Sequence, residues 1–444
     1  MFHTIKDIEQ YLEKFIYSNK LSLSPGDASI VRTKELLRLL DSPQNKLKVI
    51  HVAGTSGKGS TSFMISSFLI AHGLRVGLHL SHHLMDIRER TEINNGLIEE
   101  KKYLKYFEEI VPFVEKMRDS SYGKLTYFEL MVAFVFYVFE KEQVDYAIVE
   151  VGMGGLYDGT NVIERNDKLA VISKIGFDHI KALGNTLSKI AYHKGMICPE
   201  HGEMISIYQT ASVEKEFKRI AQRKKSKLYF VEKTAIKHIV FKNGKTTFTF
   251  QWKGKEYIDI AVGLLGFHQA QNAALALATI FHLGLRDNFT IDIQKIRSIS
   301  ENLRFKGRMD FATYNQHLIL LDGAHNVQKM KALLKTVKTV YPNKKFTFVI
   351  AFKHGKEYMK MVRLMIPFAH NIIATTIFSD NPDFGYLSTK AEEIRDALKR
   401  SGFENVLIAK TKSEVKKMIH ANDRDIIATG SLYLISDLYA LLNI

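Results

Sequence analysis

The sequence predicts an α/β protein built from two domains, and three observations carry the prediction. Apolar, strand-like segments alternate with amphipathic, helix-like segments along almost the whole chain, a pattern typical of a parallel sheet covered on both faces. A glycine-rich stretch, 51–61, separates an early strand from the helix that follows it. The alternation is interrupted once and begins again after Arg308. We therefore expect a P-loop-containing, parallel-sheet ATPase domain followed by a smaller, Rossmann-like C-terminal domain.

The first series of elements occupies the N-terminal half of the chain. Short apolar runs predict strands, and longer segments with apolar residues at helical spacing predict the helices between them. The expected strands cover 47–53, 75–80, 146–151, 169–175, 204–208 and 227–231. The expected helices cover 58–72, 99–117, 127–140, 186–193 and 212–223.

The interruption has a different pattern. Residues 246–262 alternate apolar and polar side chains around a Trp-Lys-Gly-Lys turn, which is typical of an antiparallel hairpin. Two helices, 268–283 and 291–302, are expected next. The second series then has strands over 318–321, 346–350, 371–376, 406–409 and 425–428. We place the domain boundary near 303–308, which gives domains 1–304 and 305–444.

The stretch HVAGTSGKGST, 51–61, has the composition of a nucleotide phosphate loop. Its three glycines can adopt positive φ and let backbone N–H groups surround an anion. The helix that begins near Lys58 directs the positive end of its dipole toward that anion. Lys58 adds a cation, and Ser60 or Thr61 offers a hydroxyl to Mg²⁺. The hydroxyl residue lies one place later than in the standard motif, so we interpret the stretch as a variant P-loop that binds ATP.

The composition limits the class of protein. Of the 444 residues, 46% are hydrophobic and 25% are charged, which is ordinary for a globular chain. The single cysteine, Cys198, rules out an internal disulfide and a thiolate-rich zinc site. No apolar run is long enough to span a membrane, and the first residues do not have the pattern of a secretory signal. We therefore expect a cytoplasmic protein.

The formal net charge is +16. The lysines are scattered rather than gathered in a stripe, and aromatic residues do not alternate with them as in RNA-binding proteins. We rank a solvated basic surface as the first explanation of this charge. Attraction of polyanionic substrates is the second, and nucleic-acid binding is a distant third.

Two strand ends in the first domain carry residues suited to metal binding. Glu150 ends one expected strand, before a glycine-rich turn that includes Asp158, and Asp178 and His179 follow another. The carboxyl ends of parallel strands lie at one edge of the sheet, so these groups could hold Mg²⁺ near the phosphate loop. Lys194 ends an expected helix, where a lysine ordinarily complements the helix dipole.

The second domain offers a further set of polar residues. Asp322 ends an expected strand and could hold a ribose, and His325 in the same turn could contact phosphate or an acyl phosphate. Arg308, at the domain boundary, could reach phosphate from the second domain.

These segments together resemble the folylpolyglutamate synthase and dihydrofolate synthase family, within the Mur ligase superfamily. The resemblance runs from about residue 5 to the C-terminus and is carried, in order, by HVAGTSGKGST, LSHHLMDIRERTEINNGLI, VEVGMGGLYDGTNVI, FDHIKALGNTLSKIAYHKGMI, LLGFHQAQNAALALA, GRMDF, LLDGAHN and TGSLYLISD. It implies an ATP-dependent ligase that joins glutamate to the carboxylate of a folate or pteroate. The carboxylate would first take the γ-phosphoryl group, and the amine of glutamate would then displace phosphate.

The resemblance also implies which residues form the site. ATP binding would involve Gly54, Thr55, Ser56, Gly57, Lys58, Gly59, Ser60, Asn272, Arg308 and Asp322. Two Mg²⁺ ions would be held by Ser60, Ser81, Glu150, His179 and Lys194, the last as a carbamate. The folate and glutamate would contact Ser81, His83, His325 and Ser431. Catalysis would depend on Lys58, Glu150, His179, Lys194 and His325.

The same resemblance implies the partners of the protein. We expect small-molecule substrates, namely a folate or pteroate, L-glutamate and ATP, with K⁺ as a further candidate cofactor. We expect neither nucleic acid nor membrane as a partner, and we expect a monomer.

Two alternatives stay open. The first is a Mur-type ligase that acts on a carboxylate other than folate, which is favoured by His82 and Leu156, where the family more often has proline and arginine. The second is a basic ATP-binding module that engages nucleic acid, and the net charge is its only support.

Overall fold

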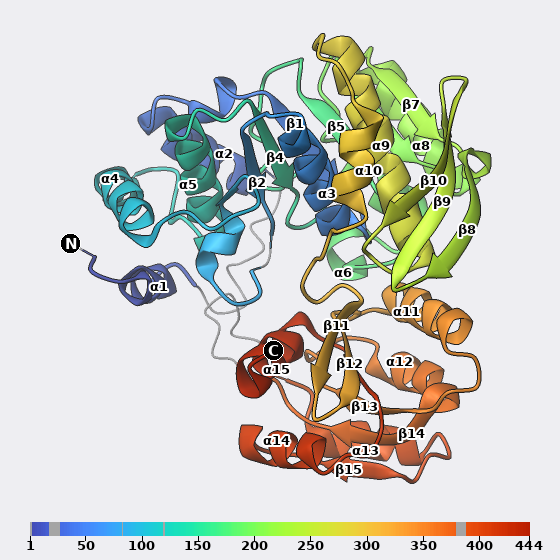
Figure 1. Cartoon of the computed structure of the whole chain (residues 1–444). Coiled ribbons are helices and arrows are strands. Elements are labelled where there is room, and N and C mark those ends of the chain that lie inside the picture. The colour runs from blue at the N-terminus through green and yellow to red at the C-terminus, as the bar shows by residue number, and fades with distance from the viewer. Residues whose placement is uncertain (1, 17–26, 82, 119, 379–387) are drawn as a thin grey trace. The chain divides into compact units, whose positions relative to one another are not determined.

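The computed structural model describes residues 2–16, 27–81, 83–118, 120–378 and 388–444, and the chain divides into two compact units (Figure 1). The first unit comprises Met1–Ile239, Thr247–Ala261 and Ala270–Asn302. The second comprises Val240–Thr246, Val262–Gln269 and Leu303–Ile444. None of the described helices is long and apolar enough to cross a membrane.

The first unit is built on a seven-stranded sheet with the order β3-β2-β4-β1-β5-β6-β7. Its strands are β1 Val49–Ala53, β2 Val76–His79, β3 Glu92–Ile93, β4 Tyr146–Glu150, β5 Leu169–Ile172, β6 Glu203–Ile207 and β7 Lys227–Val231. Every neighbouring pair is parallel except β2 with the short edge strand β3. The predicted parallel α/β architecture is therefore confirmed.

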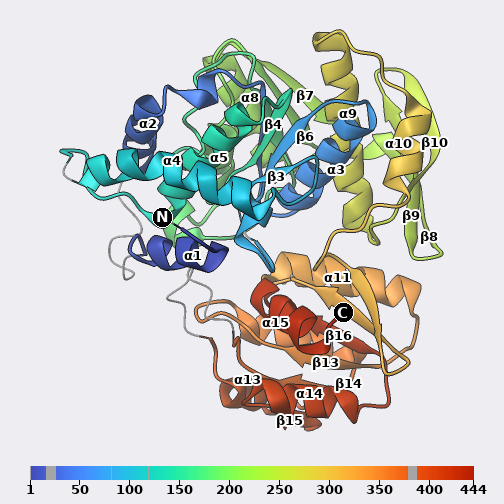
Figure 2. The same ribbon diagram turned by 60° about the vertical axis from the view of Figure 1, so that its left-hand side comes forward.

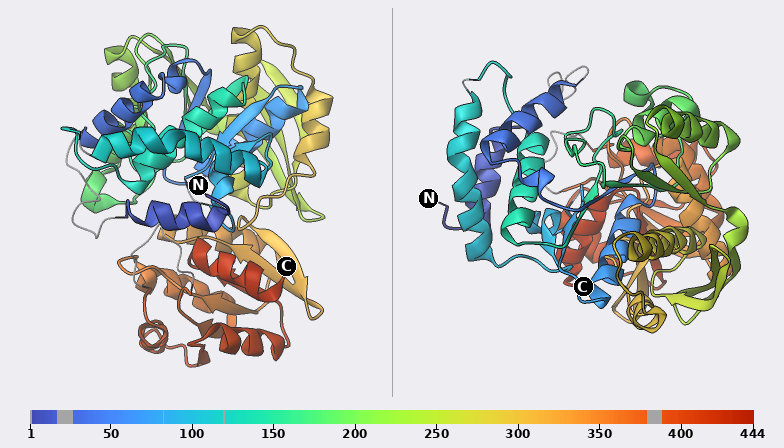
Figure 3. Two further views of the ribbon diagram at one scale, coloured as in Figure 1. Left: turned by 90° about the vertical axis from the view of Figure 1, so that its left-hand side faces the viewer. Right: turned by 90° about the horizontal axis from the view of Figure 1, so that it is seen from above.

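Helices cover both faces of this sheet. They are α1 Ile5–Glu13, α2 Ala28–Leu39, α3 Lys58–Ala71, α4 Glu100–Arg118, α5 Tyr127–Lys141, α6 Ile180–Leu183, α7 Leu187–Gly195, α8 Ala211–Arg223, α9 Phe267–Arg286 and α10 Ile293–Ser300. On one face of the sheet, the half that contains β1 and β4 packs against α1, α2, α4 and α5. On the same face, the half that contains β5 and β6 packs against α7 and α8. Helix α3 contacts β1, β2 and β4, and α10 packs on α3, as the view from above shows (Figure 3).

The structure differs from the prediction at several places in this unit, and helices α2 and α6 were not predicted. The strand expected over 169–175 ends at Ile172 as β5. Ser173 still bonds to Ala53 at the end of β1, but the Lys174 carbonyl accepts from Thr55 and Ser56 in the loop after β1 and does not continue the parallel ladder. Asp178 and His179 consequently lie on a loop several residues beyond the strand end. The edge strand β3 was not predicted, since two residues are too few for a periodic pattern.

The predicted hairpin over 246–262 is present and belongs to a three-stranded sheet with the order β10-β9-β8. Its strands are β8 Ile236–Lys242, β9 Lys245–Trp252 and β10 Lys255–Val262. Strands β9 and β10 are joined by Lys253 and Gly254, whose φ values are +46° and +79°. Two such residues form the tight turn that a two-residue hairpin loop requires. Strand β8 was not predicted.

The second unit contains a six-stranded sheet with the order β11-β12-β16-β13-β14-β15. The strands are β11 Asp310–Tyr314, β12 His317–Asp322, β13 Phe346–Ile350, β14 Ala369–Ala374, β15 Val406–Ile408 and β16 Ile426–Thr429. All five later strands are parallel, and only β11, which was not predicted, runs antiparallel to its neighbour.

The helices of the second unit lie in two layers (Figure 2). They are α11 Val327–Val340, α12 Tyr358–Met365, α13 Ala391–Lys399, α14 Lys412–His420 and α15 Leu432–Leu442. Helix α12 contacts α11 and α13, whereas α14 contacts α15. This arrangement confirms the predicted Rossmann-like α/β fold.

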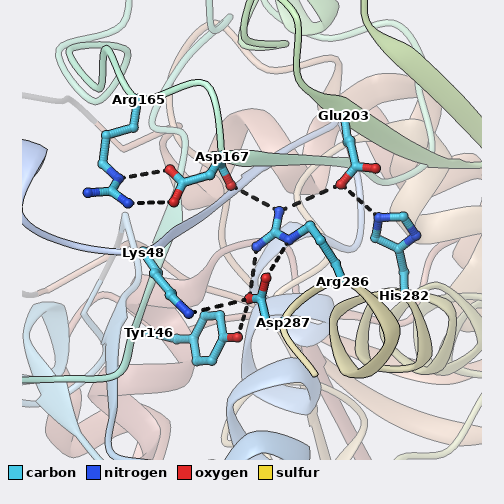
Figure 4. Close-up of polar contacts among 8 residues, drawn as sticks. All are labelled: Lys48, Tyr146, Arg165, Asp167, Glu203, His282, Arg286 and Asp287. Carbon is cyan, nitrogen blue, oxygen red and sulfur yellow. Dashed lines mark hydrogen bonds and ion pairs between the residues drawn. The ribbon is translucent and has the colours of Figure 1, made fainter. Parts of the chain in front are cut away.

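A charged network ties the C-terminal end of α9 to the amino ends of the strands in the first unit (Figure 4). The Arg286 guanidinium lies 2.8 Å from Asp287 Oδ1, donates to the Asp167 carbonyl at 2.9 Å and lies 3.7 Å from Glu203. Tyr146, at the start of β4, donates to Asp287, and His282 lies 2.9 Å from Glu203. These side chains are mostly buried, so each charge depends on its neighbours for compensation.

Replacement of Arg286 with methionine is expected to destabilise the first unit by roughly 1–3 kcal/mol, because Asp287 and Glu203 lose a cation. The matched control is Lys48→Met, since Lys48 is half exposed and lies 3.9 Å from Asp287. It should change the free energy of unfolding by less than about 0.5 kcal/mol. Urea denaturation of both variants measures the difference, and equal effects would show that the network does not stabilise the unit.

Candidate active site

The phosphate loop connects β1 to α3 as predicted, and α3 begins at Lys58. Gly54 and Gly57 have φ values of +149° and +93°, which L side chains rarely adopt. A Cβ at Gly57 would lie 2.2 Å from Asn272 Oδ1, and the loop therefore passes directly against the predicted ATP contact on α9. Gly59 is different, because it is the second residue of α3 and its φ is not positive. The prediction of positive φ is therefore wrong for Gly59.

The loop holds its own shape and leaves polar atoms for a ligand. Thr55 and Ser56 donate their backbone N–H groups to the Lys174 carbonyl at 3.0 and 3.2 Å. Among the described residues, Ser56 Oγ and Thr61 Oγ1 are buried without a hydrogen-bond partner. A buried hydroxyl without a partner costs free energy, so these two atoms fit a bound polar group better than an apolar one. Ser60 is also buried, on the first turn of α3.

Glu150 and Lys58 face each other beside the loop. Val149 packs in the core on the face of α5, and the next residue, Glu150, therefore points to the face that carries α3. Glu150 Oε1 lies 3.4 Å from Lys58 Nζ, and Glu150 Oε2 accepts from the Ser81 backbone N–H at 3.4 Å. The structure thus brings together three of the residues that the sequence singled out.

Lys194 lies at the end of α7 and is buried. Burial and the nearby Lys58 ammonium lower the pKa of Lys194 to about 7, against the opposing effects of Asp178, Asp158 and Glu150. Lys194 therefore interacts electrostatically with both Lys58 and Glu150. A large part of the Lys194 amine is therefore neutral near pH 7.

The oxygen-rich donors around Glu150 suit a hard cation such as Mg²⁺. No group of three or more His, Cys, Asp or Glu side chains within the described parts of the chain is placed to hold a metal ion. The predicted metal set has only Glu150 and His179 of these residue types, and its other members are two hydroxyls and Lys194. His179 lies on the loop after β5, is exposed and has Nε2 3.9 Å from Asp178 Oδ1, so its role as a metal ligand stays a prediction.

Ser81 and His83 are held by an arginine that the sequence did not single out. Arg90 donates from Nε to His83 Nδ1 at 2.9 Å and from Nη1 to the Ser81 carbonyl at 2.7 Å, and its guanidinium lies over the Tyr127 ring. Burial and this cation keep the pKa of His83 well below its usual value. Because charged residues are usually exposed, no sequence pattern marks a buried arginine. His82, between the two residues, lies outside the described residues.

The second unit gathers the other predicted site residues at the carboxyl ends of two neighbouring strands. Asp322 ends β12 and is paired with Thr429 at the end of β16, and Ser431 is the N-cap residue of α15, shortly after that strand. The Gly323 N–H donates to the Gly307 carbonyl at 2.9 Å. The loop that carries Arg308 therefore lies against the loop that follows Asp322.

Burial shifts the pKa values of Asp322 and His325 in opposite directions, and both shifts favour the neutral form. Burial raises the pKa of Asp322, although its carboxylate accepts from the Met309 and Ala324 N–H groups, both at 2.9 Å. Burial and three nearby cations, Lys329, Lys356 and Arg308, hold the pKa of His325 well below its usual value. His325 is therefore neutral at physiological pH.

Cys198 is not part of either group. It is buried, and burial raises the pKa of its thiol. This agrees with the interpretation of Cys198 as the end of a buried segment rather than a nucleophile.

Comparison with known proteins identifies the family. Residues 52–280 match the model of the Mur ligase middle domain, and residues 307–441 match the C-terminal domain of dihydrofolate synthetase. The chain is 30% identical to the dihydrofolate synthase/folylpolyglutamate synthase of Bacillus subtilis over 446 aligned positions, which cover 99% of each chain. The chain belongs to the folylpolyglutamate synthase and dihydrofolate synthase family.

Other members of this family agree in sequence and in structure. Dihydrofolate synthetase of Saccharomyces cerevisiae is 29% identical and covers 94% of this chain, which covers 98% of it. Folylpolyglutamate synthase of Mycobacterium tuberculosis, solved in complex with ADP, superposes with a TM-score of 0.87 at 25% identity, with 99% of this chain and 98% of that chain covered. The Thermotoga maritima enzyme gives 0.84 at 26% identity, covering 99% and 96%.

Membership fixes the general class of reaction. Enzymes of the folylpolyglutamate synthase and Mur ligase families are ATP-dependent ligases that form C–N bonds, and the predicted resemblance, fold class and enzyme class are confirmed.

Proposed function

We propose that this ligase joins L-glutamate to the carboxylate of a folate or pteroate, as a folylpolyglutamate synthase, a dihydrofolate synthase or both. The observation that carries the proposal is the Lys58–Glu150 ion pair beside the phosphate loop, together with the buried Lys194, whose pKa both groups influence. The Bacillus subtilis relative is named for both activities, and its match extends over the whole chain.

Residues 54–60, with Asn272, are proposed to bind the triphosphate of ATP. An oxygen of the substrate carboxylate attacks the γ-phosphorus, the bond to the β-phosphate oxygen breaks, and ADP leaves an acyl phosphate behind. Lys58 stabilises the charge on the transferred group, since phosphoryl transfer depends mainly on positioning and charge neutralisation. The amine of glutamate then attacks the acyl carbon, loses a proton and displaces phosphate.

Mg²⁺ is proposed to be held by Ser60, Ser81, Glu150, His179 and a carbamate on Lys194, and it would supply further neutralisation of phosphate charge. We expect two such ions, with K⁺ as a further candidate. The low pKa of Lys194 supports the carbamate, because only a neutral amine adds to CO₂. The new N–C bond forms as the amine loses a proton, and a buried cation is replaced by an anionic oxygen ligand.

We propose that the substrate-binding residues are divided between the two predicted domains. Residues 1–304 would form the ATP-binding domain, with Ser81 and His83 on the folate side. Residues 305–444 would form the ligase domain, where Arg308 and Asp322 contact ATP, and His325 and Ser431 contact glutamate.

The remaining predictions concern the setting of the enzyme. We propose a cytoplasmic monomer whose partners are small molecules. The net charge of +16 is attributed first to a solvated basic surface and second to attraction of polyanionic substrates. Salt-sensitive binding to DNA or RNA is accordingly not expected.

The test is glutamate-dependent phosphate release from ATP in the presence of Mg²⁺, with dihydropteroate, with tetrahydrofolate and with no acceptor. We expect turnover with at least one of the two pterins and only background without acceptor. Turnover with dihydropteroate would establish a dihydrofolate synthase, and turnover with tetrahydrofolate a polyglutamate synthase. If protein that binds ATP is inactive with both but active with another carboxylic acid, the acceptor proposal is wrong and the broader Mur-type alternative holds.

A further inference from the structure

The phosphate loop lies against a short segment, residues 173–176, that follows β5. The Lys174 carbonyl accepts from the Thr55 and Ser56 N–H groups at 3.0 and 3.2 Å. The approach is close, because a Cβ at Gly54 would lie 1.9 Å from a side-chain oxygen of this segment. The conformation of the phosphate loop therefore depends on the position of residues 173–176.

The side-chain amide of Gln209, in the loop after β6, holds the same segment. The main-chain pairing of β5 with β6 ends at Ile172. Beyond that point, Gln209 Oε1 accepts from the Ile175 N–H at 3.1 Å, and Gln209 Nε2 donates to the Ser173 carbonyl at 3.0 Å. An N–H can only donate and a carbonyl can only accept, so both bonds agree on one orientation of the amide. Gln209 thus binds the peptide groups on both sides of Lys174.

Gln209 is itself held by its surroundings. Its backbone N–H donates to Glu214 Oε1, in the first turn of α8, at 3.1 Å, and its Nε2 lies 3.3 Å from Ser206 Oγ. The preceding residue, Tyr208, donates its N–H to the Val231 carbonyl at the end of β7 at 2.8 Å. The loop after β6 is therefore anchored to β7 and to α8, which gives the amide a defined position.

The side chain of Lys174 makes a second connection between the two segments. Its ammonium donates to the Tyr208 carbonyl at 2.7 Å and lies 3.9 Å from the centroid of the Tyr208 ring. The Tyr208 hydroxyl accepts from Gln271 Nε2 at 2.6 Å. Gln271 precedes Asn272, which is the residue of α9 that lies against Gly57. The loop after β6 is thus connected to two elements that border the phosphate loop.

We propose that Gln209 is a positioning residue of the ligase, whose amide fixes residues 173–176 so that they hold the phosphate loop in the conformation that binds the triphosphate. The inference rests on the proposed function, which assigns residues 54–60 to ATP. Without the two bonds from Gln209, a smaller fraction of the protein has the loop in this conformation. The apparent affinity for nucleotide falls by the same factor.

The first test is the binding of ADP and Mg²⁺ to Gln209→Met, which keeps the length of the side chain and removes both hydrogen bonds. Calorimetry should give a Kd about 5- to 50-fold above that of the unaltered enzyme, because each lost bond lowers the competent fraction by about 2- to 10-fold. The matched control is Gln222→Met. Gln222 is exposed in the last turn of α8, and its variant should bind ADP as the unaltered enzyme does.

Steady-state kinetics and hydrogen exchange show where the change acts. KM for ATP should rise in Gln209→Met by a factor similar to that of Kd, and KM for glutamate should stay within about twofold. Hydrogen exchange should accelerate in peptides that contain residues 54–57 and stay unchanged in peptides from α5. An equal rise in KM for both substrates, or unchanged exchange at the phosphate loop, would overturn the proposal.

Thermal unfolding separates positioning from a purely structural role. A lower Tm with an unchanged Kd for ADP, measured well below Tm, would overturn the proposal while the proposed function stands. If Gln209→Met does not fold, Gln209→Glu keeps an acceptor for the Ile175 N–H but has no donor for the Ser173 carbonyl. It should also raise Kd, and an unchanged Kd would again overturn the proposal.

The binding experiment needs no acceptor substrate, so it also distinguishes this proposal from the proposed function. If the unaltered enzyme does not bind ADP, the assignment of the phosphate loop is wrong and the proposal is wrong with it. If it binds ADP but is inactive with both pterins, only the acceptor is wrong, and the effect of Gln209→Met on Kd should remain.

Discussion

Replacement of Lys58 with alanine is expected to lower kcat for glutamate-dependent ADP formation by about 10³-fold or more. Lys58 is the first residue of α3, and its ammonium lies 3.4 Å from Glu150, directly beside the phosphate loop. The reaction moves a highly charged phosphoryl group, and no other residue of the loop 54–60 carries a cation. Quenched-flow or coupled measurement of ADP formation tests the expectation.

The experiment must distinguish a loss of catalysis in Lys58→Ala from a loss of stability. Without Lys58, the mostly buried Glu150 carboxylate loses a cation, which is expected to lower Tm. Adding Glu150→Gln to Lys58→Ala should restore Tm without restoring activity. Lys141→Ala, which removes an exposed cation at the end of α5, serves as the matched control. Near-normal turnover of Lys58→Ala would show that the assignment of the phosphate loop is wrong.

Replacement of Lys194 with alanine is expected to lower kcat by about 10²- to 10³-fold, because the proposed carbamate supplies an anionic ligand that alanine cannot. Short carboxylates such as formate or acetate should restore part of the activity by occupying the space left by the side chain. Activity of the unaltered enzyme should fall in CO₂-free buffer and recover with bicarbonate. The matched control is Lys189→Ala, an exposed lysine of α7.

The pH dependence gives an independent measure of Lys194. The pKa of Lys194 is lowered to about 7 in the folded protein, while an unfolded lysine keeps a pKa of about 10.4. Between these values the unfolded state binds more protons, so in CO₂-free buffer this lysine makes the protein more stable as pH rises through the window. The slope of the free energy of unfolding against pH should be smaller in Lys194→Ala. Loss of activity with no rescue, no CO₂ dependence and an unchanged slope would contradict the carbamate.

Local sequence patterns predicted much of the fold. The strand over 346–350 and the strand over 227–231 were predicted with their observed bounds, and α3 begins at the predicted Lys58. Such elements bury a continuous apolar run or one apolar face, so the periodicity of their apolar residues can be recognised in the sequence. Strands β3 and β11 were missed because edge strands with half-buried side chains lack that pattern.

Some residues of the candidate site could likewise be found from local sequence patterns, and others could not. The glycines and lysine of the phosphate loop were found because their chemistry requires those residue types at that spacing. Arg90 and Lys329 were not found, because a single charged residue in a sequence is expected to be exposed to solvent as long as its neighbours in the fold are unknown. Lys194 could be assigned a role only through the family resemblance, since a lysine at a helix end is ordinary.

The sequence by itself determined the parallel α/β architecture, the phosphate loop and the family, because each depends on short segments whose residue types act locally. Only the tertiary structure decided the electrostatic state of the site. It placed Lys58, Glu150 and Ser81 together, lowered the pKa of Lys194 and paired His325 with Lys329. Burial and charge proximity arise between segments that are far apart in the chain, so no local pattern encodes them.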